Sequence, residues 1–155
     1  MQPDKPREGV LRPLREGETE TELSAVWRER ASELGVVMRR PQWSPNTMLA
    51  HEATAYAREK GLDGQLHHVL AKAYWESGAD LGDLTVVQEL AQACGLDWTE
   101  LGPRLESGYY RQQVLEGHEK AKEAGVTGTP TYQVEEGEPA FGNLSIDDLR
   151  GLIIG

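Results

Sequence analysis

The stretch "GVTGTPTYQV", residues 125–134, marks the point where the character of the chain changes. Gly125 ends a helix-like run, and Pro130 stands just before β-branched and aromatic residues that favour a strand. The "EEGEPAF" that follows supplies a turn around a glycine and a second extended piece. We therefore expect a small hairpin, in which Pro130 leaves one position of the ladder without a donor.

The peptide bond before Pro130 has two alternatives that the local sequence leaves open. A trans proline at a strand edge is the commoner form, whereas a cis bond in such a turn persists only where the fold selects it. In the cis form, the preceding backbone groups would face outward and could pair with an extended peptide.

The length and charge of the chain limit its class. Its 155 residues are enough for one compact domain, or for one domain with an insertion. The net charge of −10 would repel the phosphate backbone of a nucleic acid. No apolar run approaches the roughly 20 residues that cross a bilayer, and the N-terminus lacks the apolar core of a signal peptide. We expect a soluble cytoplasmic protein that binds neither nucleic acid nor membrane.

The N-terminal part combines an irregular segment with a helix. Residues 1–18 carry prolines and glycines among charges, which favours an extended segment. A capping box of Thr19 and Glu22 then predicts a helix that ends at Gly35. The residues expected on one face of this helix are Leu23, Val26, Trp27, Arg30 and Leu34.

Further helices follow up to Gly125. The second has two candidate starts, either Ser44 as cap with Pro45 in the first turn or Asn46 as cap. Apolar stripes at helical spacing predict further helices over 65–77, 84–94, 98–105 and 110–121. The third of these opens with a capping box of Asp97 and Glu100. After the hairpin, Ser145 caps a last helix whose expected buried side is Ile146, Leu149, Leu152 and Ile153.

The sequence offers no metal or cofactor site. Cys94 is the single cysteine, so the chain has neither an internal disulfide nor a CxxC pair, and we expect Cys94 to act as a small hydrophobe. His51 and Glu52 lack the second histidine of a zinc-protease motif. His67 and His68 point about 100° apart on a helix, which is poor geometry for one metal ion.

Several segments together resemble one family. "AKEAGVTGTPTYQV" and "AFGNLSIDDLRGLI" are similar to the C-terminal half of thioredoxin-fold proteins of the DsbA family. "PQWSPNTMLAHEATAYAREKG" and "LAKAYWESGADLGDLTVVQELAQACGLD" resemble the helical insertion of the FrnE-like subgroup, in the same order. In that family, the Gly-Val-x-Gly-x-Pro segment carries a cis-proline.

The resemblance implies a mostly helical α/β fold. It would be the C-terminal half of a thioredoxin-like fold with a DsbA-type helical insertion and a short two-stranded hairpin. The expected parts are an extended segment over 1–18, a helical insertion subdomain over 19–108 and the thioredoxin-like half over 109–155. The family's first strand, its CxxC helix and its second strand precede the part that resembles this chain.

The resemblance also implies a function and a site. The family exchanges disulfides, but without CxxC we expect this chain to be inactive alone and name no catalytic residue. Thr129 and Pro130 would bind a peptide or a protein thiol substrate. Trp43 and Asn46 would lie near the substrate groove, although Asn46 can equally cap a helix and Trp43 can cover the core.

Two other functions stay open. The chain can be a noncatalytic binding or assembly module, which uses its helical lid and the exposed edge of the "TYQV" strand. That edge would pair with a second copy, with a strand-donating partner or with "GVVM" at 35–38, or would be the least ordered part. The second of these is that the chain is a relative of glutathione-dependent isomerases, but no residue pattern in the sequence supports it.

Overall fold

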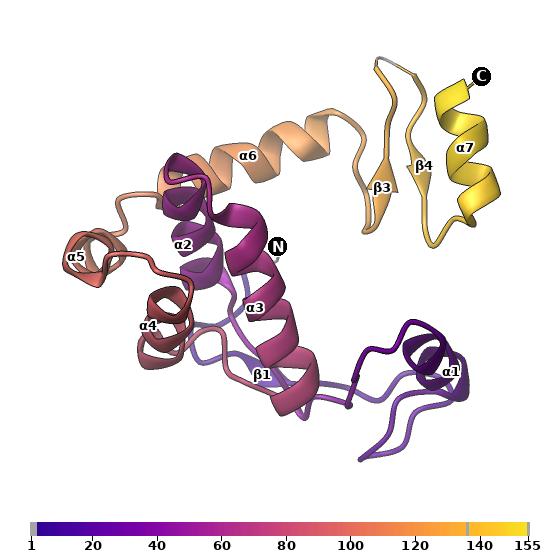
Figure 1. Cartoon of the computed structure of the whole chain (residues 1–155), viewed down its shortest axis with the longest axis horizontal. Helices are drawn as coiled ribbons and strands as arrows, with labels where there is room; N and C mark the ends of the chain where they lie inside the picture. Colours follow the sequence, from indigo (N-terminus) through magenta and orange to yellow (C-terminus); the bar gives the residue numbers. More distant parts are fainter. Residues whose placement is uncertain (1–2, 136, 155) are drawn as a thin grey trace. The chain divides into compact units, whose positions relative to one another are not determined.

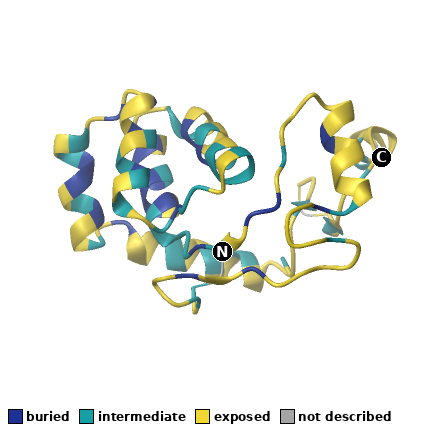
Figure 2. Ribbon diagram, turned by 90° about the horizontal axis from the view of Figure 1, so that it is seen from below, coloured by how far each residue is buried: buried dark blue, intermediate teal, exposed yellow. Residues whose placement is uncertain are grey.

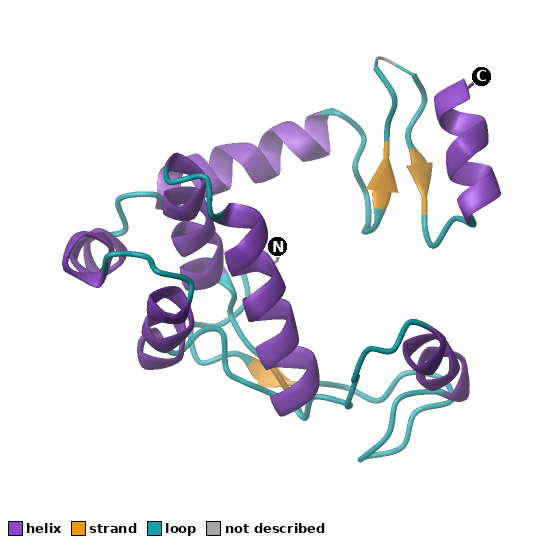
Figure 3. Ribbon diagram, in the orientation of Figure 1, coloured by secondary structure: helices purple, strands orange, loops and turns teal. Residues whose placement is uncertain are grey.

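The computed structural model describes residues 3–135 and 137–154. The described residues form seven α-helices and two separate two-stranded sheets (Figures 1 and 3). In chain order, the elements are β1 (Val10–Leu11), α1 (Ala25–Glu33), β2 (Trp43–Ser44), α2 (Met48–Glu59), α3 (Asp63–Ser77), α4 (Leu84–Ala93), α5 (Trp98–Ser107), α6 (Arg111–Glu123), β3 (Thr131–Tyr132), β4 (Ala140–Phe141) and α7 (Ile146–Ile154). This content confirms the predicted mostly helical α/β class.

The chain divides into two compact units, Met1–Val114 and Leu115–Gly155, and the boundary falls inside α6. The first unit has a well-formed core, to which α2, α3, α4 and α5 contribute (Figure 2). Its largest fully buried side chains are Tyr56, Tyr110, Leu66, Leu101, Leu105, Glu52 and Val87. In the second unit, by contrast, no described residue is fully buried.

Local capping explains where several helices begin. The carboxylate of Asp83 accepts hydrogen bonds from the backbone N–H groups of Thr85 and Val86 at the start of α4. Asp97 accepts from Thr99 in the same way at the start of α5. The second half of the predicted capping box is wrong, because the side chain of Glu100 contacts residues of α2 and the next turn of α5 and makes no bond to Asp97. Glu100 accepts instead from Tyr56, Lys60 and Arg104.

The first helix is shorter than predicted. Thr19 Oγ1 does accept from the backbone N–H of Glu22, but this bond closes a turn, and α1 begins only at Ala25. The face predicted for this helix is only partly right: Leu23 is buried, although it precedes α1, whereas Val26, Trp27 and Leu34 are exposed, Leu34 by 76 %. α1 buries Ala31 alone, because it packs against too little of the described chain to cover a wider stripe.

Of the two candidate starts of the second helix, the one at Asn46 is nearer to what the structure shows. Asn46 Oδ1 accepts a hydrogen bond from the backbone N–H of Met48, the first residue of α2, but the N-cap position belongs to Thr47, whose side chain makes no capping bond. The start at Ser44 and Pro45 is wrong, because Ser44 belongs to β2 and pairs with Val10. Within residues 3–18 the structure has turns and one short strand, β1, which pairs with β2.

The second unit contains the predicted hairpin and the last helix. β3 and β4 pair antiparallel, with Thr131 opposite Phe141 and Tyr132 opposite Ala140. "GVVM" at 35–38 forms no strand. Ser145 and Asp148 cap α7, but the predicted buried face is only half right. Leu149 and Leu152 are half-buried, whereas Ile146 and Ile153 are 68 % and 72 % exposed, because a single two-stranded sheet offers little surface to pack on.

Candidate functional site

The start of β3 is the first candidate site, and it contains Thr129 and Pro130. The peptide bond between these two residues is cis. The Pro130 carbonyl accepts a hydrogen bond from the backbone N–H of Gly142 on the β4 side, with an N···O distance of 3.0 Å. Thr131 Oγ1 donates to the carbonyl of Gly128 at 2.6 Å, which fixes the loop that leads into the strand.

The register decides which backbone groups of β3 are free. Because Thr131 lies opposite Phe141, Pro130 lies opposite Gly142, and the bond between them makes 130 and 132 the hydrogen-bonded positions of the ladder. The N–H and C=O groups of Thr131 therefore point away from β4. Among the described residues, β3 pairs with β4 only, so the edge of β3 that carries Thr131 is available to another strand.

In the first unit, the side chains of Trp43 and Asn46 both contact the backbone of the N-terminal segment. Trp43 Nε1 donates to the carbonyl of Glu8 at 2.9 Å, and Asn46 Nδ2 donates to the carbonyl of Lys5 at 2.7 Å. Gly9 packs directly under the indole: a Cβ at this position would lie 2.5 Å from Trp43 Nε1, and the φ of Gly9 is +78°. The structure thus brings Trp43 and Asn46 together, whereas Thr129 and Pro130 belong to the other unit.

A buried ion cluster also holds the N-terminal segment. The side chain of Glu18 is 2 % exposed and accepts from both terminal nitrogens of Arg12, at 2.7 and 2.8 Å. Arg40 approaches the same carboxylate at 3.4 Å and donates to the carbonyl of Arg12. The hydrogen bonds from Arg12 lower the pKa of Glu18 to about 2, against the opposing effect of burial. Sequence reasoning missed this cluster, because Arg40 lies 22 residues from Glu18 and no local pattern links them.

A second buried carboxylate joins α2 to α6. Glu52 has no exposed surface, and its Oε1 accepts from Nε and Nη2 of Arg111 at 3.1 and 3.0 Å. Burial raises the pKa of Glu52, although the nearby guanidinium acts in the opposite direction. The one sequence signal for this pair was an acidic residue among the buried alanines of α2.

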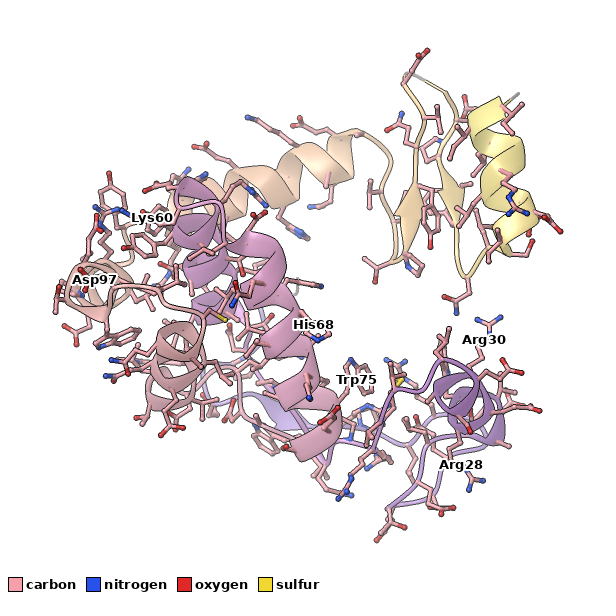
Figure 4. All side chains as sticks on the ribbon, in the orientation of Figure 1. Arg28, Arg30, Lys60, His68, Trp75 and Asp97 are labelled. Carbon is pink, nitrogen blue, oxygen red and sulfur yellow. The ribbon has the colours of Figure 1, made fainter. Side chains whose placement is uncertain are left out.

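A third polar group, on α2 and α5, surrounds the guanidinium of Arg104. The ring of Tyr56 lies 5.4 Å from this guanidinium and that of Tyr110 5.9 Å, and Arg104 Nη1 donates to the hydroxyl of Tyr110. Lys60 and Asp97, labelled in Figure 4, lie at the ends of α2 and α5 beside this group. Every polar partner in it is paired, so its arrangement serves to hold the helices together.

The described part of the chain contains no exposed thiol and no cluster of metal-ligating side chains. Cys94 is a free cysteine that is 5 % exposed, and burial raises the pKa of its thiol. The prediction that it packs as a small hydrophobe is confirmed by its place in the core. Among residues 3–135 and 137–154, no three His, Cys, Asp or Glu side chains gather as metal ligands. His67 and His68 are both exposed on α3, and Figure 4 labels His68 on this helix.

Within the described residues, no helix has the length and apolar character needed to span a bilayer.

Comparison with known proteins assigns the chain to a family. The DSBA-like thioredoxin domain matches residues 6–153. The chain is also 29 % identical over 105 residues to the uncharacterized protein YwbO of Bacillus subtilis, a match that covers 66 % of this chain and 52 % of YwbO. The chain thus spans about half the length of this curated relative. Because the domain match covers nearly the whole sequence, the chain belongs to the DSBA-like thioredoxin domain family.

Proposed function

We propose that the free edge of β3, from Thr129 to Gln133, binds an extended segment of a protein substrate, and that the chain performs no disulfide exchange by itself. The family handles protein thiols and disulfides, and a peptide can add to an exposed strand through its main chain. The observation that carries the proposal is the register of the hairpin, which directs the N–H and C=O of Thr131 away from β4.

The absence of exchange follows from the thiol content. Disulfide exchange requires an attacking thiolate and a second thiol that resolves the mixed disulfide. The sequence contains one cysteine, and Cys94 is buried with a raised thiol pKa, so it is both inaccessible and largely protonated at neutral pH. The proposed chemical role of this chain is therefore substrate binding, within the class of thiol-disulfide oxidoreductases.

For Trp43 and Asn46 we propose a structural role in place of the substrate groove. The indole N–H of Trp43 and the amide N–H of Asn46 both donate to backbone carbonyls of the N-terminal segment, and Asn46 Oδ1 accepts from the backbone N–H of Met48. These bonds leave no polar group of either side chain directed at a ligand.

Amide chemical shifts test the peptide site directly. We expect a short extended peptide to move the amide signals of Thr131 and Gln133 more than that of Tyr132, whose N–H faces β4. The matched control is the same peptide with N-methyl groups on alternate residues, which cannot donate to the strand. Equal binding of both peptides, or shifts confined to the first unit, would overturn the proposal.

A pair of variants at one position tests the backbone contact. Thr131→Pro removes the N–H that faces outward, whereas Thr131→Ala keeps it. We expect Thr131→Pro to weaken peptide binding about tenfold, the effect of one net hydrogen bond, and Thr131→Ala to bind like the native chain. Insulin reduction gives the second readout: we expect none from the native chain, and turnover that persists in Cys94→Ser would contradict a purely binding role.

A further inference from the structure

Glu52 is a buried titratable group that the proposed function does not use. Its side chain has no exposed surface, and it lies on α2 among alanines that are buried in the core of the first unit. Its Oε1 accepts two hydrogen bonds from Arg111, whereas its Oε2 makes none to any residue in 3–135 or 137–154. A carboxylate removed from water stays charged only where a partner compensates for the lost hydration, so the charged form of Glu52 depends on Arg111.

Arg111, in contrast, reaches the solvent. Its side chain is 53 % exposed, and it is the first residue of α6. α6 buries none of its residues, and within the described part of the chain no other helix or strand packs closely against it. The pair thus joins a helix without buried residues to a group inside the core, near the point where the first unit continues into the second.

We propose that the Glu52–Arg111 pair is a pH-sensitive switch, in which a proton on Glu52 weakens the pair and releases the first turn of α6 from α2. Oε2 is the oxygen that takes the proton, because Oε1 already faces two N–H donors. The attraction between opposite charges is then lost, and the guanidinium is left with a neutral acceptor.

The direction of the effect follows from the open state, in which Arg111 has left Glu52. Burial raises the pKa of Glu52, and the charge and hydrogen bonds of Arg111 lower it. When Arg111 leaves, Oε2 still lies in the core, so the effect of burial stays while the effect of Arg111 is lost. The open state therefore binds a proton more tightly than the closed state, and acid shifts the equilibrium toward the open state.

The other titratable groups around α2 act on residues other than Glu52. α2 packs against α3, α4 and α5. The titratable groups of those helices that interact with α2 are Asp63 and His67 of α3, Cys94 after α4, and Glu100 and Arg104 of α5. Among the described residues, none of these acts on the pKa of Glu52, whereas Arg111 does. On α6 itself, Glu116 and His118 lie beyond the first turn.

The switch goes beyond the proposed function and does not rest on it. Both of its residues belong to the first unit, whereas the peptide site that we propose lies on β3 in the second. α6 leads through Gly125 to the loop that carries Thr129 and Pro130, so the switch controls how the start of this connection is anchored.

Hydrogen exchange of two N–H groups tests the switch in the full chain. The Nε–H of Arg111 is bonded to Glu52 when the pair is closed, and the backbone N–H of Val114 is bonded to the carbonyl of Tyr110 in the first turn of α6. We expect both to exchange slowly at neutral pH. Below the ordinary value of 4.5, both should exchange about tenfold faster, relative to the intrinsic rate at each pH.

Three variants show whether Glu52 is responsible. Glu52→Gln keeps the shape of the side chain without its charge, so we expect fast exchange at Val114 at both pH values. Arg111→Gln breaks the pair from its exposed end, without a change in the core, and should behave in the same way. Glu106→Gln, at an exposed position on α5, is the matched control and should keep the pH response of the native chain.

Two results would overturn the proposal. The first is exchange at Val114 in the native chain that does not respond to pH, or that responds equally in Glu52→Gln. The second is an equal increase at core amides such as that of Leu66, which would show that acid opens the whole first unit. These measurements use no peptide, so their failure would leave the site on β3 in place, and failure of peptide binding would leave the switch in place.

Discussion

Arg111, the first residue of α6, donates two hydrogen bonds to a single oxygen of Glu52, at 3.1 and 3.0 Å, while Glu52 itself is fully buried. The other oxygen, Oε2, makes no hydrogen bond to any residue in 3–135 or 137–154. A buried carboxylate with only one of its oxygens paired keeps much of its desolvation cost. This pair therefore attaches α6 to α2 through a carboxylate whose charged form is unfavourable in the folded chain.

Glu52→Gln should change how stability depends on pH. Burial raises the pKa of Glu52 above the ordinary value of 4.5, so folding favours the protonated acid. The stability that this acid contributes is present below pH 4.5 and is lost as the pH rises through the raised value. Relative to Glu52→Gln, we expect the native chain to lose unfolding free energy as the pH rises above 4.5, as measured by urea denaturation.

Two further variants make this test specific. Arg111→Met removes the cation that opposes the rise in the pKa of Glu52. The loss of unfolding free energy should therefore occur at higher pH, and at neutral pH it should be larger than in the native chain, by about 1–3 kcal/mol. Glu106→Gln, at an exposed position on α5, is the matched control for loss of one carboxylate. A pH profile that is the same in Glu52→Gln and Glu106→Gln would show that Glu52 is not the group responsible.

Glu18→Gln should release the N-terminal segment. The carboxylate of Glu18 pairs with Arg12 and Arg40, both of which are buried, and the change leaves the two cations without their anion. We expect a loss of about 3 kcal/mol and faster amide exchange at Val10 and Leu11. The control is Glu16→Gln, an exposed position two residues earlier, which should leave exchange in β1 unchanged.

The cluster of Glu18 with Arg12 and Arg40 also predicts that the chain loses stability in acid. The pKa of Glu18 is lowered to about 2, so its contribution to stability is complete above the ordinary value of 4.5 and is lost as the pH falls toward 2. Amide hydrogen exchange in the N-terminal segment, relative to its intrinsic rate at each pH, should therefore increase as the pH falls. Proteolysis of this segment should increase over the same range. Glu18→Gln should show no such change, and a similar increase in both proteins would assign it to another group.

Cys94 should be unreactive in the folded chain. Its thiol is buried in the core of the first unit, and burial raises its pKa, so little thiolate is accessible. We expect slow labelling by a chromogenic disulfide reagent in buffer and complete labelling in urea. Rapid labelling of the native chain would contradict both this burial and the proposed lack of exchange chemistry.

Ser145→Ala should weaken α7. Ser145 Oγ accepts from the backbone N–H of Asp148, and Asp148 Oδ2 accepts from the N–H and the hydroxyl of Ser145, so both halves of the capping box form. We expect a loss of about 1 kcal/mol in local helix stability, seen as faster amide exchange over α7. Ser32→Ala, on the exposed surface of α1, is the control.

Acid should act on the same cap. The hydrogen bonds from Ser145 lower the pKa of Asp148 below its ordinary value of 3.8. The stabilisation of α7 is therefore present above that value and is lost as the pH falls through the lowered one. Exchange over α7 that does not respond to pH in this range would show that Asp148 contributes little to the cap.

Features that depend on neighbours a few residues apart could be predicted from the sequence. Asp97 and Ser145 cap the helices that follow them, as predicted, because an N-cap contacts backbone groups only two or three residues later. The hairpin after Pro130 and the burial of Cys94 followed from β-forming and apolar patterns in the same way. Thr19 shows the limit of such reasoning, since its bond to Glu22 closed a turn and no helix began there.

The sequence by itself determined the order of the helices, the position of the hairpin, the family and the lack of a thiol pair, because each is written in residue types and short spacings. Only the tertiary structure decided which charges are buried and with whom. Glu52 and Arg111 are 59 residues apart, and Glu18 and Arg40 are 22 apart. No periodic pattern encodes such pairs, because the cost of burying a charge is offset only where packing brings its partner within hydrogen-bonding distance.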